Sequence, residues 1–246
     1  MVEGSARSIR IAAETGSTNA DLLDALRSGE RVPEGEWLVT DRQTAGRGRQ
    51  GREWFDGAGN FMGSTVVRPG PGDPPAHTLA LVAGLALHEA ATPLSGDPSR
   101  LRLKWPNDLM LGEAKVAGIL LEREGDAVVL GIGVNLAKAP KVPGRRTMAF
   151  AEVGPAPDRD LFACDLAIAL DRELERWRTY GLEAILRRWQ AAAFAIGTKL
   201  SVHEPDGTAR EGAFGGLDDN GSLQLRLGDG SLRTIHAGDV MLAKET

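Results

Sequence analysis

Three arginines alternate with three glycines in the segment QTAGRGRQGREW, residues 43–54. Glycines let a backbone approach a ligand and present its N–H groups, and the guanidinium groups of Arg47, Arg49 and Arg52 match the oxygens of a carboxylate or phosphate. The segment therefore predicts a local anion-binding loop. Its composition alone is equally typical of a flexible solvated loop or a weak RNA-binding segment.

A second segment whose residues could take part in binding or catalysis is KWPNDLMLGEAKVAGILLE, residues 104–122. Its proline restricts the backbone, and Asn107 with Asp108 favours a turn between two strands. Lys115 stands at the start of an apolar strand, where a lysine is more often an exposed edge charge than a functional group. Gly118 in that strand would let another group pack closely against the backbone.

Two shorter segments carry weaker signals. GIGVN, residues 131–135, ends an apolar strand with small residues, and Asn135 could hydrogen-bond a ligand. STN, residues 17–19, is by itself a helix N-cap, although its hydroxyl and amide groups could equally satisfy a buried polar ring.

Strands and helices must position these segments. We expect strands at 8–13, 37–40 and 61–67, a run of short strands through 101–136, and helices at 17–29, 77–91, 158–180 and 182–196. In the first helix, Ser17 or Thr18 should form the cap and Gly29 the end. Leu22, Leu23 and Leu26 of that helix should face the core. The last two helices, separated by Gly181 and closed by Gly197, should cover one face of the sheet.

Beyond Gly197 the pattern changes to brief strands, KLSVHE, REGAFGGL, SLQLRL and RTIHAGDVML, separated by the turn sequences DG, DDNG and GDG. This pattern predicts a small β-barrel, which should pack against the main domain because so short a chain buries only a modest core. The expected domains are a catalytic domain at 1–196 and the barrel at 197–246.

Composition limits the classes of function. Lys and Arg number 29 against 34 Asp and Glu, so the net charge of −5 gives no general attraction to nucleic acid or to an anionic membrane. The first residues lack a secretory signal, and the longest apolar stretch is too short to span a bilayer, which favours a cytoplasmic protein.

Cysteine and histidine usage is sparse. The single cysteine, Cys164, cannot form an internal disulfide, and its helical surroundings predict a buried structural thiol. The histidines, His77, His88, His203 and His236, lie far apart in the sequence and predict no transition-metal centre.

Taken in order, STN, QTAGRGRQGREW, KWPNDL with a lysine seven residues after its aspartate, and GIGVN closely resemble the biotin protein ligases. The resemblance covers about residues 9–137 by motif, and the tail resembles the small C-terminal domain of the family more loosely. It implies an α+β fold, with a mixed sheet covered by helices as in class II synthetases and a C-terminal SH3-like β-barrel. It also implies a reaction in which ATP activates biotin to biotinyl-5′-AMP and biotin passes to a lysine of a biotin carboxyl carrier protein.

The resemblance also implies roles for particular residues. It implies a biotin pocket of Ser17, Thr18, Asn19, Gln43, Gly46, Arg47, Gly48, Arg49, Lys115 and Gly118. It implies an ATP site of Arg49, Arg52, Trp54, Asn107, Asp108, Lys115 and Asn135, with Trp54 against the adenine. Lys115 would have the main electrostatic role in catalysis, assisted by Arg47 and Arg49. Mg²⁺ would be bound mainly by ATP phosphates, so no protein metal site is expected.

Some features depart from the family, and two alternatives remain. Glu53 places negative charge near the expected nucleotide, and the strand FMGSTVV is less aromatic than in relatives. No DNA-binding domain fits before Ser8, so we expect no sequence-specific DNA binding, and the protein should be a monomer or weak homodimer. The alternatives are a lipoate or octanoyl ligase or transferase, which KWPND and the GRGRQGR loop argue against, and an RNA-binding module that uses the glycine-arginine loop.

Overall fold

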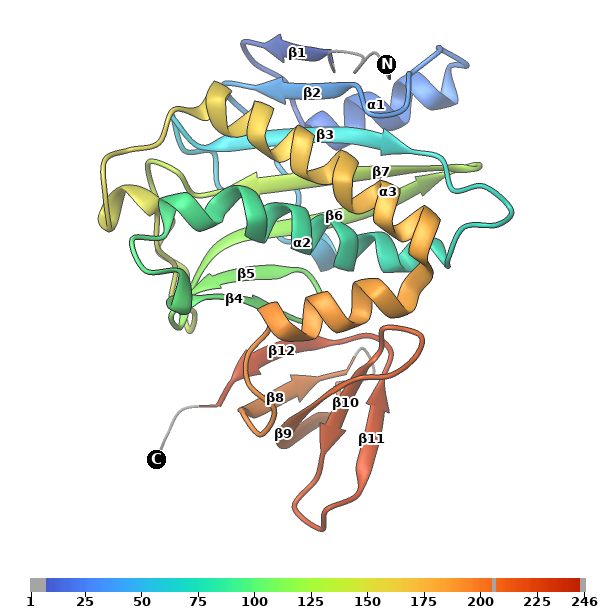
Figure 1. Ribbon diagram of the computed structural model, residues 1–246. Helices are drawn as coiled ribbons and strands as arrows, with labels where there is room; N and C mark the ends of the chain where they lie inside the picture. Colours follow the sequence, from blue (N-terminus) through green and yellow to red (C-terminus); the bar gives the residue numbers. More distant parts are fainter. Residues whose placement is uncertain (1–7, 205–206, 244–246) are drawn as a thin grey trace.

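The chain is described here by a computed structural model over residues 8–204 and 207–243, which form a large mixed sheet and a smaller antiparallel one (Figure 1). The large sheet has the order β1-β2-β3-β7-β6-β5-β4, in which β1 and β2 are parallel and the other neighbours antiparallel. Its strands are β1 Ile9–Ala12, β2 Trp37–Thr40, β3 Phe61–Val67, β4 Leu101–Lys104, β5 Asp108–Leu111, β6 Ala114–Glu124 and β7 Ala127–Val134. The fold class expected from the sequence is confirmed for this part.

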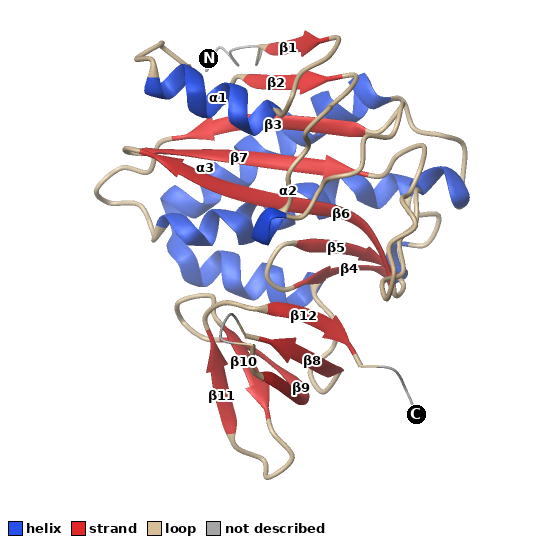
Figure 2. Cartoon of the chain, turned by 180° about the vertical axis from the view of Figure 1, so that it is seen from behind, coloured by secondary structure: helices blue, strands red, loops and turns tan. Residues whose placement is uncertain are grey.

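Helices cover both faces of the large sheet. Helices α2 Leu79–Ala91 and α3 Arg159–Ala192 lie on one face, and α1 Thr18–Arg27 lies on the other (Figures 1 and 2). Successive side chains of a strand point to opposite faces of the sheet. Because helices cover both faces, every residue of the central strand β7 is buried. Single turns of 3₁₀ helix connect these elements at η1 Arg49–Gly51, η2 Ala76–Thr78, η3 Thr92–Leu94, η4 Pro98–Arg100 and η5 Phe150–Glu152.

The first helix follows its sequence pattern. Leu22 and Leu23 are buried against the sheet, and Leu26 packs at the margin of the same apolar cluster. The helix ends at Arg27, and Gly29 adopts a φ of 78°, the left-handed conformation that commonly follows a helix. The predicted inward face and end of this helix are therefore confirmed.

The long helix α3 is broken at Gly181, whose φ of 72° is not helical. Glu173, which is 0% exposed, accepts hydrogen bonds of 2.6 Å from Arg176 before the break and from Arg188 after it. The predicted break is confirmed, but the predicted end at residue 196 is wrong. The helix ends at Ala192 because the next residue extends to form a bridge with Leu103 of β4.

The C-terminal strands form a separate five-stranded antiparallel sheet of the order β11-β10-β9-β8-β12, consistent with the expected SH3-like domain. They are β8 Lys199–His203, β9 Ala209–Leu217, β10 Leu223–Arg226, β11 Leu232–Ile235 and β12 Asp239–Leu242. The prediction of one final strand over RTIHAGDVML is wrong. It divides at residues 236–238 because β11 pairs with β10 at one edge, whereas β12 crosses to pair with β8 at the other.

The small sheet packs against the large one, and the contact is at the β4 edge, which the sequence did not specify (Figure 1). Lys104 Nζ donates to the carbonyl of Val240 at 2.6 Å, and Trp105 Nε1 donates to the carbonyl of Gly221 at 3.0 Å. Both donors stand at the end of β4 and its following turn. The small sheet is thereby held next to the loop that carries Asn107.

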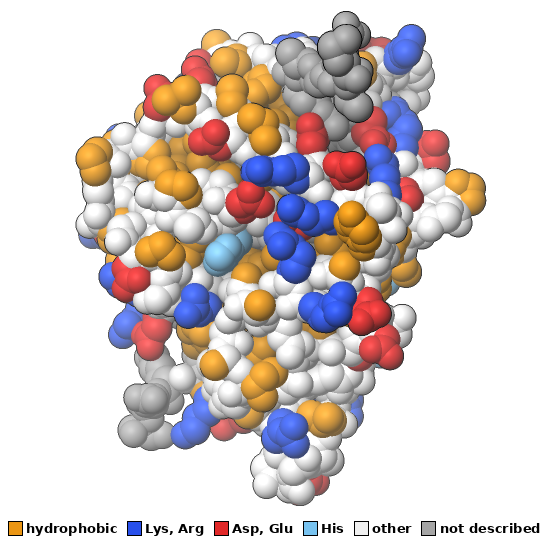
Figure 3. All heavy atoms as spheres, in the orientation of Figure 1, with side chains coloured by type: hydrophobic (Ala, Val, Ile, Leu, Met, Phe, Trp, Pro, Cys, Tyr) orange, Lys and Arg blue, Asp and Glu red, His pale blue; other side chains and the backbone are white. Residues whose placement is uncertain are grey.

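Cys164 lies on α3 but is exposed, so the prediction of a buried thiol is wrong. The helical period turns Ala163, Leu166 and Ala167 toward the core and leaves Cys164 on the opposite side. On this outer surface, charged and apolar side chains are interspersed (Figure 3). Within the described ranges, no helix has both the length and the apolar character needed to cross a bilayer.

Candidate active site

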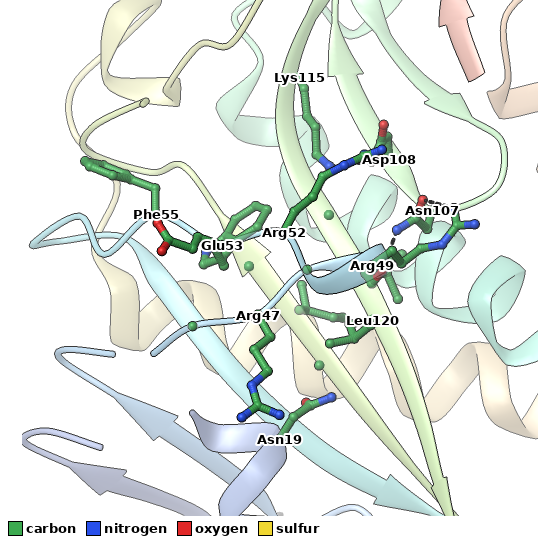
Figure 4. A pocket seen from close by; sticks show the side chains of 18 of the residues that line it. Asn19, Arg47, Arg49, Arg52, Glu53, Phe55, Asn107, Asp108, Lys115 and Leu120 are labelled. Carbon is green, nitrogen blue, oxygen red and sulfur yellow. Dashed lines mark hydrogen bonds and ion pairs between the residues drawn. The ribbon is translucent and has the colours of Figure 1, made fainter. Parts of the chain in front are cut away.

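A cavity of about 790 Å³ opens on the α1 side of the large sheet, between the β2–β3 loop, the β4–β5 turn and the edge of the small sheet (Figure 4). Its floor contains Gly118 of β6 and Gly131 and Gly133 of β7, and Gly118 is paired with Gly133 in the sheet. A Cβ added at Gly131 would lie 2.2 Å from Asn19 Oδ1, and one at Gly133 would lie 2.2 Å from the Trp54 ring. The glycines of GIGVN therefore make room for the side chains of Asn19 and Trp54.

One wall of the cavity is a chain of hydrogen-bonded polar side chains. Gln43 Oε1 accepts from the backbone N–H of Thr18 at 2.9 Å, and Thr18 Oγ1 lies 2.7 Å from Ser64 Oγ. Ser64 Oγ donates to Asn19 Oδ1 at 2.6 Å, and Asn19 Nδ2 donates to Glu122 Oε2 at 2.8 Å. This chain joins the β2–β3 loop, α1, β3 and β6, with Ser64 and Glu122 on two strands that flank β7.

The start of α1 belongs to this wall. Ser17 occupies the N-cap position, but its side chain makes no capping hydrogen bond, so the sequence interpretation of a simple cap is wrong in that respect. The first N–H groups of a helix lack intrahelical partners, and Gln43 supplies one for Thr18. Ser17 is 4% exposed and lines the cavity. The STN segment therefore turns its polar groups toward the cavity.

Lys115 is an interior residue of the sheet and not an exposed edge charge. Its Nζ lies 2.6 Å from Asp108 Oδ1, and Lys104 Nζ lies 2.9 Å from Asp108 Oδ2. Burial alone would raise the pKa of Asp108, but the two ammonium groups hold it well below its ordinary value. Asp108 is therefore a buried carboxylate with a cation on each side.

A β-bulge directs Lys115 into the cavity. The pairing of β5 with β6 shifts so that Leu109 faces Ala117 whereas Met110 faces Lys115, which places one extra residue in β6. Such a bulge changes which face a side chain reaches. Lys115 consequently shares a face with Gly118, where an added Cβ would lie 3.0 Å from Lys115 Nζ.

The glycine-arginine segment folds over this cavity and reaches the small sheet. Arg49 donates to Asn107 Oδ1 at 3.0 Å and to the carbonyl of Gly238 at 3.2 Å, as Figure 4 shows for the first contact. Burial lowers the pKa of the Arg49 guanidinium. Arg52 pairs with Asp239 at 2.8 Å. Two arginines thus link the loop to the start of β12 and to Gly238 just before it.

Two further arginines belong to this region, Arg145 beside the loop and Arg47 within it. Arg145 also pairs with Asp239, so that this carboxylate bridges two arginines. Burial would raise the pKa of Asp239, but the hydrogen bond from Arg52 and the charge of Arg145 hold it below its ordinary value. Arg47 is exposed, and its side chain extends toward Asn19 (Figure 4).

The structure brings every predicted site residue to this one cavity. They are Ser17, Thr18, Asn19, Gln43, Gly46, Arg47, Gly48, Arg49, Arg52, Trp54, Asn107, Asp108, Lys115, Gly118 and Asn135. Trp54 Nε1 and Asn135 Oδ1 are buried and have no hydrogen-bond partner within the described residues. The Trp54 ring lies against Gly118 and Gly133, with Lys115 Nζ 5.7 Å from its centroid. Glu53 also lines the cavity.

Several polar residues in or next to the cavity were missed by the sequence analysis, among them Ser64, Glu122, Arg145 and Asp239. Ser64 is the one hydroxyl on the cavity face of β3, since the neighbouring Thr65 points to the other face, and this is the signal that could have identified it. Glu122 lies on the same face as Gly118 by strand alternation. Asp239 had no comparable signal, because its pairing with the loop depends on how the small sheet docks. Among the described residues, no cluster of acidic, histidine or cysteine side chains could hold a metal ion.

Comparisons with known proteins agree with this geometry. Residues 12–137 match the biotin/lipoate A/B protein ligase family, and residues 201–242 match the biotin protein ligase C terminal domain. The biotin--[acetyl-CoA-carboxylase] ligase of Paracoccus denitrificans is 42% identical over 240 residues, 93% of this chain and 98% of that protein. The enzyme of the same name from Mycobacterium tuberculosis is 36% identical over 241 residues, 96% of this chain and 89% of that protein.

A solved structure extends the likeness to three dimensions. The biotin protein ligase from Aquifex aeolicus in complex with biotin and ATP has a TM-score of 0.83 and 25% sequence identity, covering 96% of this chain and 99% of that one. The match includes both the large sheet and the small C-terminal one. This chain therefore belongs to the biotin/lipoate A/B protein ligase family.

Proposed function

We propose that this protein is an ATP-dependent biotin protein ligase, which forms biotinyl-5′-AMP and then transfers biotin to a lysine of a biotin carboxyl carrier protein. The observation that carries the proposal is the convergence of four separate sequence segments on one cavity that is polar at one end and cationic at the other. Curated relatives with the same function align over nearly the whole chain. Biotin and ATP are accordingly the substrates.

The polar wall fits the head of biotin. A cyclic urea in an apolar cavity needs partners for its N–H and carbonyl groups, because each unpaired buried polar group costs about 1–3 kcal/mol. Ser17, Thr18, Asn19 and Gln43 supply hydroxyl and amide groups at this wall. The floor glycines Gly131 and Gly133 let Asn19 and Trp54 pack closely around the cavity, and Gly46, Gly48 and Gly118 allow close approach of the backbone.

The cationic end fits the reacting groups. A carboxylate oxygen of biotin attacks the α-phosphorus of ATP, the new O–P bond forms and pyrophosphate leaves, although both reactants are anions. Lys115 provides the main electrostatic stabilisation, and Arg47 and Arg49 assist it. In the second step the carrier lysine amine attacks the acyl carbon and AMP leaves. No protein nucleophile is required.

The same end would hold the nucleotide. Arg52, Asn107, Asp108 and Asn135 bind its polar groups, and Trp54 offers an aromatic surface to the adenine. Mg²⁺ is held mainly by triphosphate oxygens and water, a usual arrangement for this ion. That assignment fits the residues present, because Asp108 is ionised at neutral pH and both its oxygens are already paired with lysines.

Further proposals concern organisation and partners. The catalytic domain comprises residues 1–196 and the small C-terminal domain residues 197–246. The protein acts in the cytoplasm as a monomer or weak homodimer and does not recognise a DNA sequence. The arginine contacts to Gly238 and Asp239 support a role for the small domain in holding the glycine-arginine loop.

The function can be tested by incubating the purified protein with biotin, MgATP and a biotin carboxyl carrier domain. Mass spectrometry should find one biotinylated lysine on the carrier, and omission of ATP should abolish it. Lipoate in place of biotin provides the parallel arm. Modification by lipoate alone would instead indicate a lipoate ligase, and salt-sensitive RNA binding without ATP turnover would indicate a nucleic-acid module.

A further inference from the structure

Glu122 does not line the cavity, yet it ends the polar chain that does. Asn19 Nδ2 donates to Glu122 Oε2 at 2.8 Å, and Glu122 is half-buried on β6. The proposed reaction does not involve this carboxylate directly. Its effect on the cavity must therefore pass through Asn19.

A carboxylate accepts hydrogen bonds and cannot donate, so Glu122 determines which way the Asn19 amide faces. The amide nitrogen turns to Glu122, which leaves Asn19 Oδ1 to Ser64. An amide oxygen only accepts, so the single hydroxyl hydrogen of Ser64 must point to it over 2.6 Å. Ser64 then has no hydrogen left for Thr18, and Thr18 Oγ1 must donate to Ser64 over 2.7 Å.

This fixed direction reaches the cavity. Thr18 Oγ1 could also donate to Gln43 Oε1 at 3.2 Å, but its single hydrogen goes to the nearer Ser64 Oγ at 2.7 Å, because Ser64 has already given its own hydrogen to Asn19. Both oxygen lone pairs of Thr18 Oγ1 are then free to accept from a ligand. Gln43 Oε1 accepts the backbone N–H of Thr18 at 2.9 Å, which leaves Gln43 Nε2 as a donor. The wall consequently offers an acceptor beside a donor.

We propose that Glu122 is a positioning residue for ligand specificity, because it sets the direction of every hydrogen bond from Asn19 through Ser64 to Thr18. The resulting pattern complements a ring that carries an N–H next to a carbonyl, as in the cyclic urea of biotin. This inference rests on the proposed function and deepens it. Nothing in the geometry requires Glu122 to touch the ligand.

The test is Glu122→Gln, which keeps the size of the side chain but can donate as well as accept. Asn19 can then turn its amide oxygen to residue 122 and its amide nitrogen to Ser64. The hydrogen bonds of the chain then reverse, so that Ser64 donates to Thr18 and occupies one of the Thr18 Oγ1 lone pairs. We expect the Kd for biotin, measured by isothermal titration calorimetry, to rise about tenfold, the effect of roughly one hydrogen bond. The Kd for MgATP should change less than about twofold.

Glu124→Gln is the matched control. Glu124 lies two residues farther along β6 and also pairs with α1, through Arg27 at 2.7 Å, but at the surface. It has no bond to the polar chain in the described structure. This variant should bind biotin as the wild type does. Thermal unfolding of both variants checks that each is folded.

A double-mutant cycle with Ser64→Ala separates the relay from a local structural effect. Without the Ser64 hydroxyl, no direction can pass from Glu122 to Thr18, so Glu122→Gln should then change the Kd for biotin less than about twofold. Thr18→Val provides a second break in the chain if Ser64→Ala does not fold. Desthiobiotin, which keeps the cyclic urea but lacks the sulfur, should lose affinity by the same factor as biotin.

Two results would overturn the inference. One is unchanged biotin affinity in Glu122→Gln. The other is a tenfold loss that persists in full when Ser64 or Thr18 is also replaced. If the wild-type protein itself bound no biotin, the proposed function would fail instead, and the two failures are therefore distinguishable.

Discussion

Replacement of Asp108 by asparagine should lower the free energy of unfolding, because Asp108 is the only carboxylate between the largely buried ammonium groups of Lys104 and Lys115 in the described structure. The carboxylate is 7% exposed and lies 2.6 Å from Lys115 Nζ and 2.9 Å from Lys104 Nζ. Asp108→Asn keeps the shape of the side chain but removes its negative charge. Two ammonium groups would then remain close together without a counter-ion.

The magnitude follows from burial. Removing one partner of a buried ion pair costs about 3–5 kcal/mol. The Lys104 and Lys115 side chains are 12% and 22% exposed, so water screens part of this cost, and the asparagine oxygen still accepts one hydrogen bond. We therefore expect a loss of about 2–3 kcal/mol in the free energy of unfolding at pH 7. For a protein of this size the melting temperature should fall by roughly 4–12 °C.

Acid should reduce this difference. The pKa of Asp108 in the folded protein lies below its ordinary value, so its stabilisation is fully present above about pH 4. As the pH falls further, the unfolded chain takes up the proton first, and the contribution declines toward the folded pKa. Wild type and Asp108→Asn should therefore converge in unfolding free energy below about pH 4.

Urea unfolding followed by circular dichroism measures both effects, with Glu113→Gln as the control. Glu113 pairs with Arg146 at 2.6 Å, but the two side chains are 65% and 77% exposed, so its replacement should cost less than about 1 kcal/mol. If Asp108→Asn cost no more than Glu113→Gln at pH 7, the reasoning about the buried cluster would be refuted.

Three further predictions concern the reaction. Gly131→Ala should raise the KM for biotin about tenfold or more in steady-state assays, because its Cβ would lie 2.2 Å from Asn19 Oδ1. Lys115→Met should lower the single-turnover rate of adenylate formation about 10²–10³-fold, because it removes the cation at the reacting groups. Arg49→Gly should release biotinyl-5′-AMP early and label lysines of bystander proteins, which mass spectrometry would detect, because its contacts to Asn107 and Gly238 are lost.

Each of these has a control or a contrary outcome. Gly154→Ala, with open space around the added Cβ, should leave the KM for biotin unchanged. If Lys115→Met formed the adenylate at the wild-type rate, Lys115 could not be the main source of electrostatic stabilisation in that step. Confinement of label to the carrier in Arg49→Gly, with the same adenylate lifetime, would exclude the loop as the group that retains the intermediate.

Local patterns explain how much of the fold could be predicted from sequence. Strands β2 and β3 begin and end where expected, because short apolar runs there are bounded by turn residues. The burial of Cys164 was predicted wrongly because burial on α3 depends on how the helix is rotated about its axis against the sheet. The division of the last segment into β11 and β12 was not predicted, because β11 pairs with β10 and β12 with β8. The second of these pairings joins residues that are far apart in the sequence.

The site shows the same division. Gln43 and Lys115 were identified through the resemblance to the biotin protein ligases, whose motifs lie within single short segments, whereas the residue pattern alone favoured an exposed edge charge for Lys115. The hydrogen bonds of Ser64 and Glu122 to Asn19 were not predicted, because they join residues that are 45 and 103 positions apart in the sequence. The direction of a hydrogen-bond chain depends on which atoms meet in space, and no local pattern of residues encodes it.

The central claim is that one cavity brings the carboxylate of biotin and the α-phosphorus of ATP together beside cationic side chains. Exchange of labelled pyrophosphate into ATP measures that step without any carrier protein. We predict exchange only when biotin is present, and its loss in Lys115→Met. Absence of biotin-dependent exchange in the wild-type protein, together with no measurable affinity for biotin, would contradict the account.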